Sequence, residues 1–301
     1  MNTFRSCLMI MLMSASFLLG GCDAAKCSGA RTTSVEEYYQ GTLPLADIGA
    51  IASDWDQVIA NTDEWKRNMR IITTLLLSEP WATLKLCFNS EMWSDIKKAK
   101  KHLLLDPKTG HKIYGSDNYV QFFIDKYGSQ LGSVKESLVD IINEVNPIYS
   151  TCALYATLGF PLVIWTNNNY VSYEAKLANL NKHATADTKG IPMNPQTVFV
   201  AGSNPDFPEE QRNLKGKPDK EYYTRAYAYT KKALNLSDTA SVIFVDDMAV
   251  NVHGLREVAK ELNLPLIGIQ YTTPEQLEYD FNLLMGKEAV SPIQDVPEPV
   301  R

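Results

Sequence analysis

The sequence lacks the features that mark several classes of protein. Its 29 lysine and arginine residues are outnumbered by 35 aspartate and glutamate residues, and the resulting net charge of −6 is opposite to the basic excess of nucleic-acid-binding proteins. No internal repeat is evident. With 45% hydrophobic and 21% charged residues, the composition excludes a collagen-like or mostly disordered chain. A length of 301 residues predicts one large domain or two small ones.

Cysteine and histidine are scarce. The five cysteines include no CxxC pair and the four histidines show no ligand spacing, so no zinc site is predicted. Cys87 and Cys152 lie in one helical segment and could form a disulfide, whereas two buried free thiols are the alternative. In both cases Cys27 has no predicted disulfide partner.

Long hydrophobic runs are absent as well. The apolar run Cys7–Leu19, which follows Arg5, is shorter than the roughly 20 residues of a membrane-spanning helix but suits the core of an export signal. Two glycines then precede Cys22, and this pattern resembles the lipobox of bacterial lipoproteins. The resemblance implies cleavage before Cys22 and attachment of lipid to it. An aspartate follows at position 23, which resembles an inner-membrane retention signal, but the choice of membrane stays open.

These features predict an exported bacterial lipoprotein that faces the periplasm or the cell surface and contacts the membrane through its lipid alone. The expected segments are a signal peptide (1–21), a tether (22–44), an α/β core (45–62 and 159–287), a helical cap (63–158) and a disordered tail (288–301).

Short apolar runs indicate the fold class. They do not alternate with polar residues, which is typical of buried parallel strands, and they are Ile48–Ser53, Leu162–Trp165, Thr197–Ala201, Val242–Val245 and Leu266–Gln270. Helices are predicted between the later strands and after the last, at Lys220–Leu236, His253–Leu262 and from an N-cap at Thr273 to Met285. This alternation predicts an α/β fold with a parallel sheet covered on both faces.

The segment between the first two predicted strands is different. From Asp63 to about Thr157 its pattern is almost wholly helical. One apolar face is formed by Ile71, Ile72, Leu75 and Leu76, and Gly159 is placed to end the last helix. The sequence therefore predicts an all-helical insertion after the first strand.

Polar side chains follow three of the predicted strands. They are Asp54 and Asp56 after the first, Thr166 and Asn167 after the second, and Asp246 and Asp247 after the fourth. Ligands of open parallel sheets bind beyond the carboxyl ends of the strands, so these side chains are expected to share one pocket. A carboxylate cluster is costly unless a cation neutralises it, and hard oxygen ligands suit Mg²⁺. Each pair alone has a second interpretation, a solvated turn or helix N-terminus.

At these residues the sequence resembles the haloacid dehalogenase-like (HAD) phosphohydrolase superfamily, over about residues 48–286. The family pattern hhhDxDxT/V is matched by Asp54, Asp56 and Val58. The resemblance implies a Rossmann-like core with a helical cap inserted after the first strand. Trp55 and Gln57 depart from the residues frequent in that motif.

The resemblance also implies roles for individual residues. Asp54 would be the nucleophile that forms an aspartyl-phosphate, and Asp56 the general acid. Thr166, Asn167 and Lys217 would bind the phosphoryl group, and Lys215 is the alternative to Lys217.

The predicted metal ligands for Mg²⁺ are Asp54, Asp56 and Asp246, with Asp247 in support. Asn251 also matches a common family position.

The predicted function is a Mg²⁺-dependent phosphatase that acts on a small phosphorylated substrate and binds no nucleic acid. The substrate and the oligomeric state stay open. The alternative is a catalytically weak binding or interaction lipoprotein on the same scaffold, with Trp81 and Trp93 at its recognition surface. Packing in the core of the helical segment is the expected role of these tryptophans.

Overall fold

The computed structural model describes most of the chain between residues 47 and 287. The described residues are 34–35, 47–61, 64–101, 103–107, 110, 112–113, 116–132, 134–167, 176–180, 198–200 and 215–287. The predicted signal, Cys22, Cys27 and the tail lie outside them, as does the tether except for residues 34–35. Within the described part, no helix combines the length and the apolar character that crossing a membrane requires.

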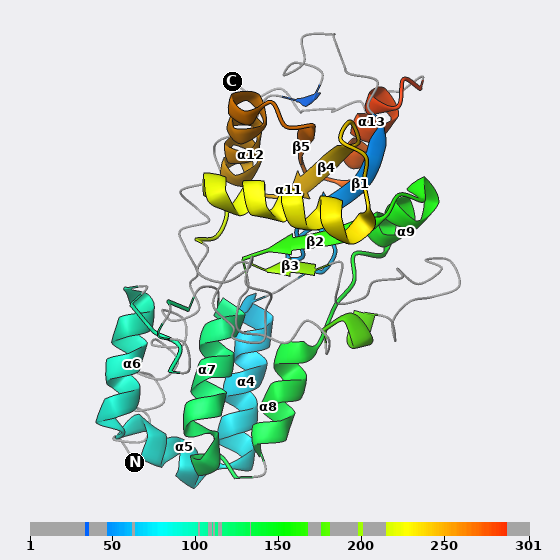
Figure 1. The fold of residues 1–301 in the computed structure, drawn as a ribbon. Coiled ribbons are helices and arrows are strands. Elements are labelled where there is room, and N and C mark those ends of the chain that lie inside the picture. Colours follow the sequence, from blue (N-terminus) through cyan, green and yellow to red (C-terminus); the bar gives the residue numbers. More distant parts are fainter. Residues whose placement is uncertain are drawn as a thin grey trace, which may run out of the picture.

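A five-stranded parallel sheet forms the core of the upper lobe in Figure 1. Its spatial order is β3-β2-β1-β4-β5, and its strands are β1 (Ile48–Ser53), β2 (Leu162–Thr166), β3 (Val198–Val200), β4 (Ser241–Asp246) and β5 (Leu266–Gln270). The predicted α/β class and parallel sheet are confirmed. All five predicted strands form, and the third is shorter than predicted within the residues described. The first strand in the chain is central in the sheet, between β2 and β4.

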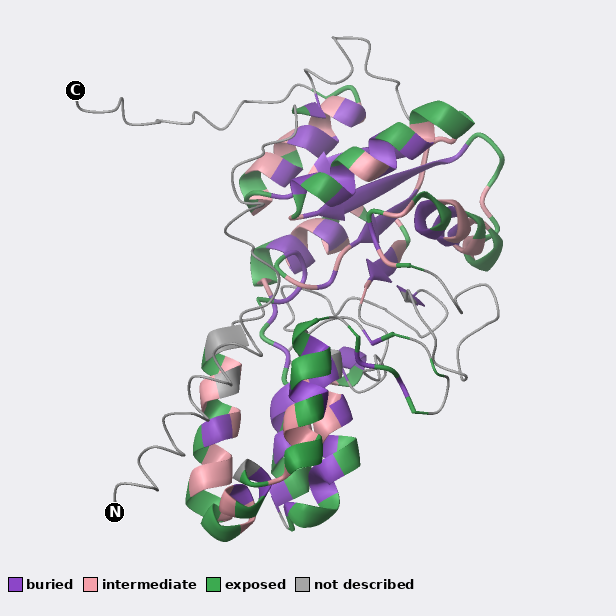
Figure 2. Cartoon of the chain, turned by 90° about the vertical axis from the view of Figure 1, so that its left-hand side faces the viewer, coloured by how far each residue is buried: buried purple, intermediate pink, exposed green. Residues whose placement is uncertain are grey.

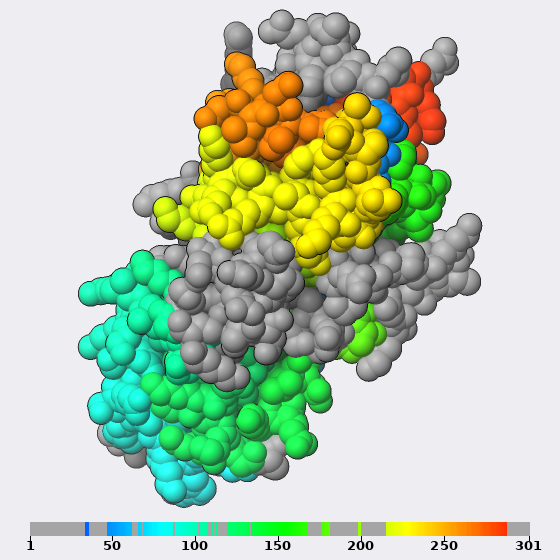
Figure 3. Space-filling model, viewed as in Figure 1, coloured from blue at the N-terminus to red at the C-terminus, as the bar shows by residue number. Residues whose placement is uncertain are grey.

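Both faces of the sheet are buried, which explains why the strand residues do not alternate in polarity (Figure 2). On one face, α11 (Lys220–Leu234) and α12 (Ala249–Leu262) pack against an aromatic layer that includes Trp165 and Phe244. In Figure 3 these two helices cover the sheet from the viewer's side. On the other face, α9 (Tyr149–Leu158) and α13 (Pro274–Leu284) pack against Ile51 and its neighbours.

The ends of these helices follow the predicted capping signals in part. Gly159 ends α9 with a left-handed φ of 71°, as predicted. The Thr273 side chain accepts a hydrogen bond from the backbone N–H of Gln276 at the start of α13. Helix α12 begins at Ala249, earlier than the predicted His253, because the chain turns into the helix directly after β4.

The helices that first follow β1 form a second lobe (Figures 1 and 3). They are α4 (Glu64–Ser78), α5 (Pro80–Cys87), α6 (Ser90–Lys100), α7 (Ser116–Tyr127), the 3-10 turn η1 (Gly128–Gln130) and α8 (Val134–Asn143). Their apolar side chains form a separate core in which Leu138 is nearly inaccessible. The sequence predicts α9 as part of this helical segment. In the structure, its residues Cys152 and Tyr155 pack in the core beneath the sheet.

Two antiparallel linkers join the lobes. The backbone N–H of Asn61 donates to the carbonyl of Asn146 at 2.8 Å, and the N–H of Ile148 donates to the carbonyl of Ile59 at the same distance. The chain thus leaves the sheet and returns to it through one paired connection.

Trp81 does not have the expected role in core packing. Its side chain is 76% exposed, and Leu77 and Phe88 beside it in sequence are 78% and 71% exposed. Helices form at α4 and α5 as the pattern predicts, but the apolar face that includes Ile71 and Leu75 does not extend to these positions. Trp93 on α6 is half-buried.

Cys152 is a free thiol, so the alternative of a disulfide with Cys87 is wrong. It lies on α9 in the core of the sheet, where its sulfur approaches the carbonyl oxygen of Ile59 at 3.9 Å. Burial raises the pKa of this thiol to about 11, which keeps it protonated and unreactive at neutral pH.

A buried acid on α13 makes stability depend on pH. Asp280 is 4% exposed, and burial raises its pKa from 3.8 to about 6, although a hydrogen bond from Gln276 and the charge of Arg256 oppose the rise. Because the folded state binds the proton more tightly than the unfolded state, stability is lost as the pH rises from about 4 through 6.

We therefore expect Asp280→Asn to stabilise the protein above pH 6 and to have little effect below pH 4. A shift of two pKa units corresponds to at most about 3 kcal/mol of unfolding free energy. Urea unfolding of both proteins at pH 4 and pH 8 measures the difference. An equal effect at the two pH values would contradict the assignment of the pH dependence to Asp280.

Candidate functional site

The ends of three neighbouring strands bring the predicted site residues together. Asp54 follows β1, and its backbone N–H donates to the carbonyl of Val245 in β4 at 2.8 Å, which extends the sheet by one residue. Thr166 ends β2 and Asp246 ends β4, on either side of β1. The predicted convergence at the carboxyl edge is therefore observed.

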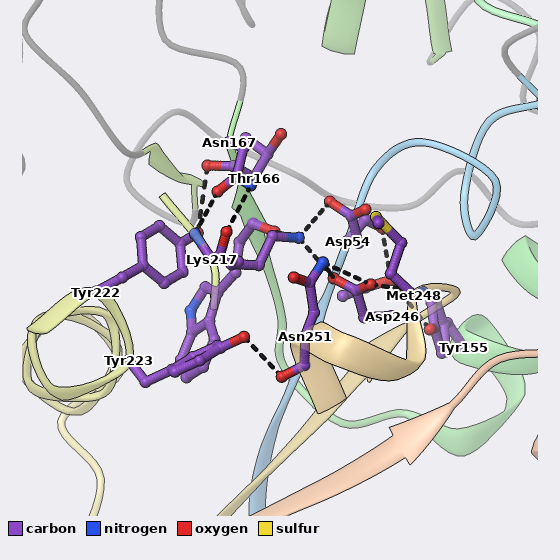
Figure 4. Close-up of polar contacts among 12 residues, drawn as sticks. Asp54, Tyr155, Thr166, Asn167, Lys217, Tyr222, Tyr223, Asp246, Met248 and Asn251 are labelled. Atoms are coloured by element: carbon purple, nitrogen blue, oxygen red, sulfur yellow. Dashed lines mark hydrogen bonds and ion pairs between the residues drawn. The ribbon is translucent and has the colours of Figure 1, made fainter. Parts of the chain in front are cut away.

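Lys217 occupies the middle of this edge (Figure 4). Its Nζ atom lies 2.8 Å from Oδ1 of Asp54 and 2.7 Å from Oδ2 of Asp246, and it donates to the backbone carbonyl of Trp165 at 3.0 Å. Three oxygens thus satisfy the three ammonium protons. The lysine side chain is only 2% exposed, so this is a buried charge held by two carboxylates.

The pKa of Lys217 depends on the charges of Asp54 and Asp246. Burial lowers the pKa of Lys217, but the charges of Asp246 and Asp54 outweigh burial and hold it above its ordinary value. The lysine is therefore charged at neutral pH. Removing it would leave two buried carboxylates without a counterion, which is costly.

The negative charges of the acids are only partly offset by the positive charge of Lys217. Burial raises the pKa of Asp54 well above its ordinary value, because the charges of Asp246 and Asp56 add to the effect of burial and that of Lys217 only partly offsets them. The pKa of Asp247 is raised to about 6 by burial and by the charge of Asp246. One lysine does not neutralise this cluster.

Asp246 is held in place from two sides. Its Oδ1 atom accepts a hydrogen bond from the backbone N–H of Met248 at 2.9 Å, and the Asn251 amide donates to both carboxylate oxygens at 3.0 and 3.1 Å. The hydroxyl of Tyr223 donates to the carbonyl of Asn251 at 2.7 Å. The first turn of α12 therefore positions the carboxylate, and α11 supports that turn.

Asn167 holds the loop that carries Lys217. Its Oδ1 atom accepts the backbone N–H of Lys217 at 2.7 Å, and its Nδ2 atom donates to the carbonyl of the same residue at 3.3 Å. A Cβ atom at Gly216 would lie 2.5 Å from the Asn167 Oδ1 atom. Only glycine therefore allows the amide to approach the loop this closely. Asn167 was predicted to bind substrate, but in the structure its amide binds the backbone of Lys217.

The two lysines that the sequence left as alternatives are clearly different. The Lys215 side chain is 83% exposed and lies 4.0 Å from Asp219, whereas Lys217 is buried among the acids. The structure therefore places Lys217 in the site.

The acids that could hold a metal ion are Asp54, Asp246 and Asp247, whose oxygens lie within 4.8 Å of one another. Among the described residues this group does not include Asp56, which was predicted as a ligand. Asp56 lies in the tight turn after β1, where Gln57 has a left-handed φ of 62°. Asp247, predicted in support only, belongs to the group itself.

Two tyrosines of the site were not predicted. The hydroxyl of Tyr222 donates to the carbonyl of Thr166 at 3.2 Å, and Tyr223 supports Asn251. The sequence predicted the helix that carries both residues, but a buried tyrosine gives no signal in the sequence for the partner of its hydroxyl.

Comparisons with known proteins identify no relative. No protein-family model, no curated protein and no solved structure matches the chain.

The close approach at Gly216 can be tested by a double-mutant cycle. We expect Gly216→Ala to destabilise the protein by about 1–3 kcal/mol, because the new methyl group displaces the Asn167 amide. Asn167→Ala removes both hydrogen bonds and costs a similar amount.

Adding Gly216→Ala to Asn167→Ala should then cost clearly less than adding it to the wild type, since the clash is already gone. Chemical denaturation of the four proteins measures the coupling. Additive effects would contradict the contact.

Proposed function

We propose that the protein is a Mg²⁺-dependent phosphatase of the HAD type that hydrolyses phosphomonoesters through an aspartyl-phosphate. One observation carries this proposal: a buried lysine bridges Asp54 and Asp246 at the ends of adjacent strands, with Asp247 beside them. Helices α4 to α8 would then be the cap of that family. Export and a lipid anchor at Cys22 remain part of the proposal.

The donor set fits a hard divalent cation. Asp54, Asp246 and Asp247 carry three negative charges against the single positive charge of Lys217, which leaves a formal excess of two. Mg²⁺ prefers carboxylate oxygens and keeps several waters. When bound, such an ion would offset the repulsion between these carboxylates and an incoming phosphate. It would also favour the ionised form of Asp54, whose pKa burial raises.

The protein's own residues would carry the covalent steps. Lys217 contacts Oδ1 of Asp54, and the other carboxylate oxygen, Oδ2, would attack phosphorus. The bond from phosphorus to the ester oxygen breaks, and Asp56 protonates the departing alkoxide. Asp56 then takes a proton from a water molecule, which attacks phosphorus, displaces Asp54 and releases inorganic phosphate.

Two further residues would orient the phosphoryl group. Thr166 ends β2 at the same edge, and the charge of Lys217 would attract the phosphoryl oxygens as well as the carboxylates. Asn167 would act indirectly, because it binds the backbone on both sides of the lysine side chain.

A second candidate function is binding without turnover. The exposed Leu77, Trp81 and Phe88, which lie on or beside α4 and α5, favour it, because exposed large apolar side chains can mark a contact with a partner. A measurement of turnover separates the two functions.

The first prediction for the site concerns activity. Purified protein should hydrolyse a generic aryl phosphate in the presence of Mg²⁺, and a metal chelator should abolish the reaction. Asp54→Asn should reduce kcat at least about 1,000-fold, because the amide is not a nucleophile.

The control is Asp238→Asn, which removes an exposed aspartate paired with Lys231 on the surface. Its activity should equal that of the wild type. Absence of Mg²⁺-stimulated hydrolysis by the wild type across a broad phosphomonoester panel would reject the proposed reaction and favour the binding function.

The second prediction concerns the metal alone. A saturating concentration of Mg²⁺ should raise the melting temperature of the wild type, because the ion binds only the folded arrangement of carboxylates. Asp247→Asn should weaken this effect, because it removes one of the three acids. Asp238→Asn should retain it. A shift of equal size in all three proteins would show that the ion acts elsewhere.

A further inference from the structure

A cavity lies where the two lobes meet. It has a volume of about 340 Å³ and lies between the first turns of α4, the end of α8 and both linkers. Its described lining residues are Trp55, Ala60, Asn61, Lys66, Arg67, Arg70, Ile141, Ile142, Glu144, Val145, Asn146, Pro147, Tyr149 and Lys176. A volume of this size accommodates a small organic molecule.

The cavity is separate from the acid site. Trp55 contributes to its wall, and the chain neighbours of that residue are Asp54 and Asp56, neither of which is among the described lining residues. Trp55 is 1% exposed and packs in the core on the α9 side of the sheet. At the turn after β1, Asp54 therefore belongs to the acid cluster, and its neighbour Trp55 lines the cavity.

Positive charge dominates the described lining. Lys66, Arg67 and Arg70 come from α4, and Lys176 comes from the helical residues 176–180. Glu144 is the one acid among the described lining residues, and it forms an ion pair with Arg70. Lys176 is only 3% exposed, so its charge is held inside the protein and is not screened by solvent.

Arg67 has two polar atoms without a hydrogen bond, which sets it apart among the cations of the described lining. The residue has an interaction within the chain, and its Nε and Nη2 atoms are buried without a hydrogen bond. These two atoms form one edge of the guanidinium group, and that geometry matches a pair of oxygens on a carboxylate or phosphate. The side-chain amides of Asn61 and Asn146 and the hydroxyl of Tyr149 belong to residues of the same lining and add polar groups.

We propose that this cavity binds a small anion through a carboxylate or phosphate group, and that Arg67 is its principal contact. The ligand touches both lobes, because α4 and α8 belong to the helical lobe whereas Trp55 and Lys176 belong to the sheet lobe. Binding therefore fixes the orientation of one lobe relative to the other. This site does not depend on the proposed phosphatase reaction.

Calorimetric titration in metal-free buffer tests the site, with inorganic phosphate and malonate as separate probes. Without a divalent cation, the acid cluster around Asp54 repels both anions, so saturable binding reports the cavity. At least one probe should bind, and which one binds distinguishes phosphate from carboxylate chemistry. Arg67→Ala should weaken that binding at least about tenfold. Arg67→Lys should restore it only in part, because an ammonium group lacks the planar edge.

The matched control is Arg225→Ala, which removes the same charge from α11, where the side chain is 41% exposed and paired with Glu221. Its affinity should equal that of the wild type. Lys66→Ala serves as a second variant, since Lys66 is exposed and its loss leaves no buried void, and it should also weaken binding. The proposal is wrong if neither probe binds the wild type, or if Lys66→Ala and every folded Arg67 variant bind as the wild type does.

Discussion

The buried contact of Lys217 with Asp54 and Asp246 is the constraint on which the rest of the site depends. A lone buried ammonium group would lose its proton or unfold the region around it. Here it is paired with two carboxylates and a backbone carbonyl, and the structure must bring these oxygens from three separate strands to one point. The order β2-β1-β4 accomplishes this, because it makes the three carboxyl ends neighbours.

The surrounding layers can be understood as support for that contact. The small side chains of Ala50 and Ala52 leave room on the α11 side of β1 for the large aromatic side chains of the neighbouring strands. Tyr223 in that layer reaches the backbone of Asn251, whose amide holds Asp246. Packing and polar positioning are therefore not independent here, because the same residues of α11 do both.

The sequence predicted the sheet and the meeting of its acids because both follow from patterns along the chain. Apolar runs predicted the strands, and Asp54 and Asp246 stand directly after two of them. It could not predict that Asn167 binds the backbone of Lys217, since this contact joins residues 50 positions apart and depends on the missing side chain of Gly216. The packing of α9 on the sheet and the exposure of Trp81 are likewise tertiary facts, which helical periodicity does not encode.

Opposite charges lie on the two sides of the turn that follows β1. The acid cluster has a formal excess of two negative charges, whereas basic residues predominate in the described lining of the cavity beside Trp55. Charges held in a protein interior interact more strongly than charges in water, because the interior screens them less. A cation held by the acids would lower their repulsion of an anion in the cavity, so the two proposed ligands would favour each other's binding.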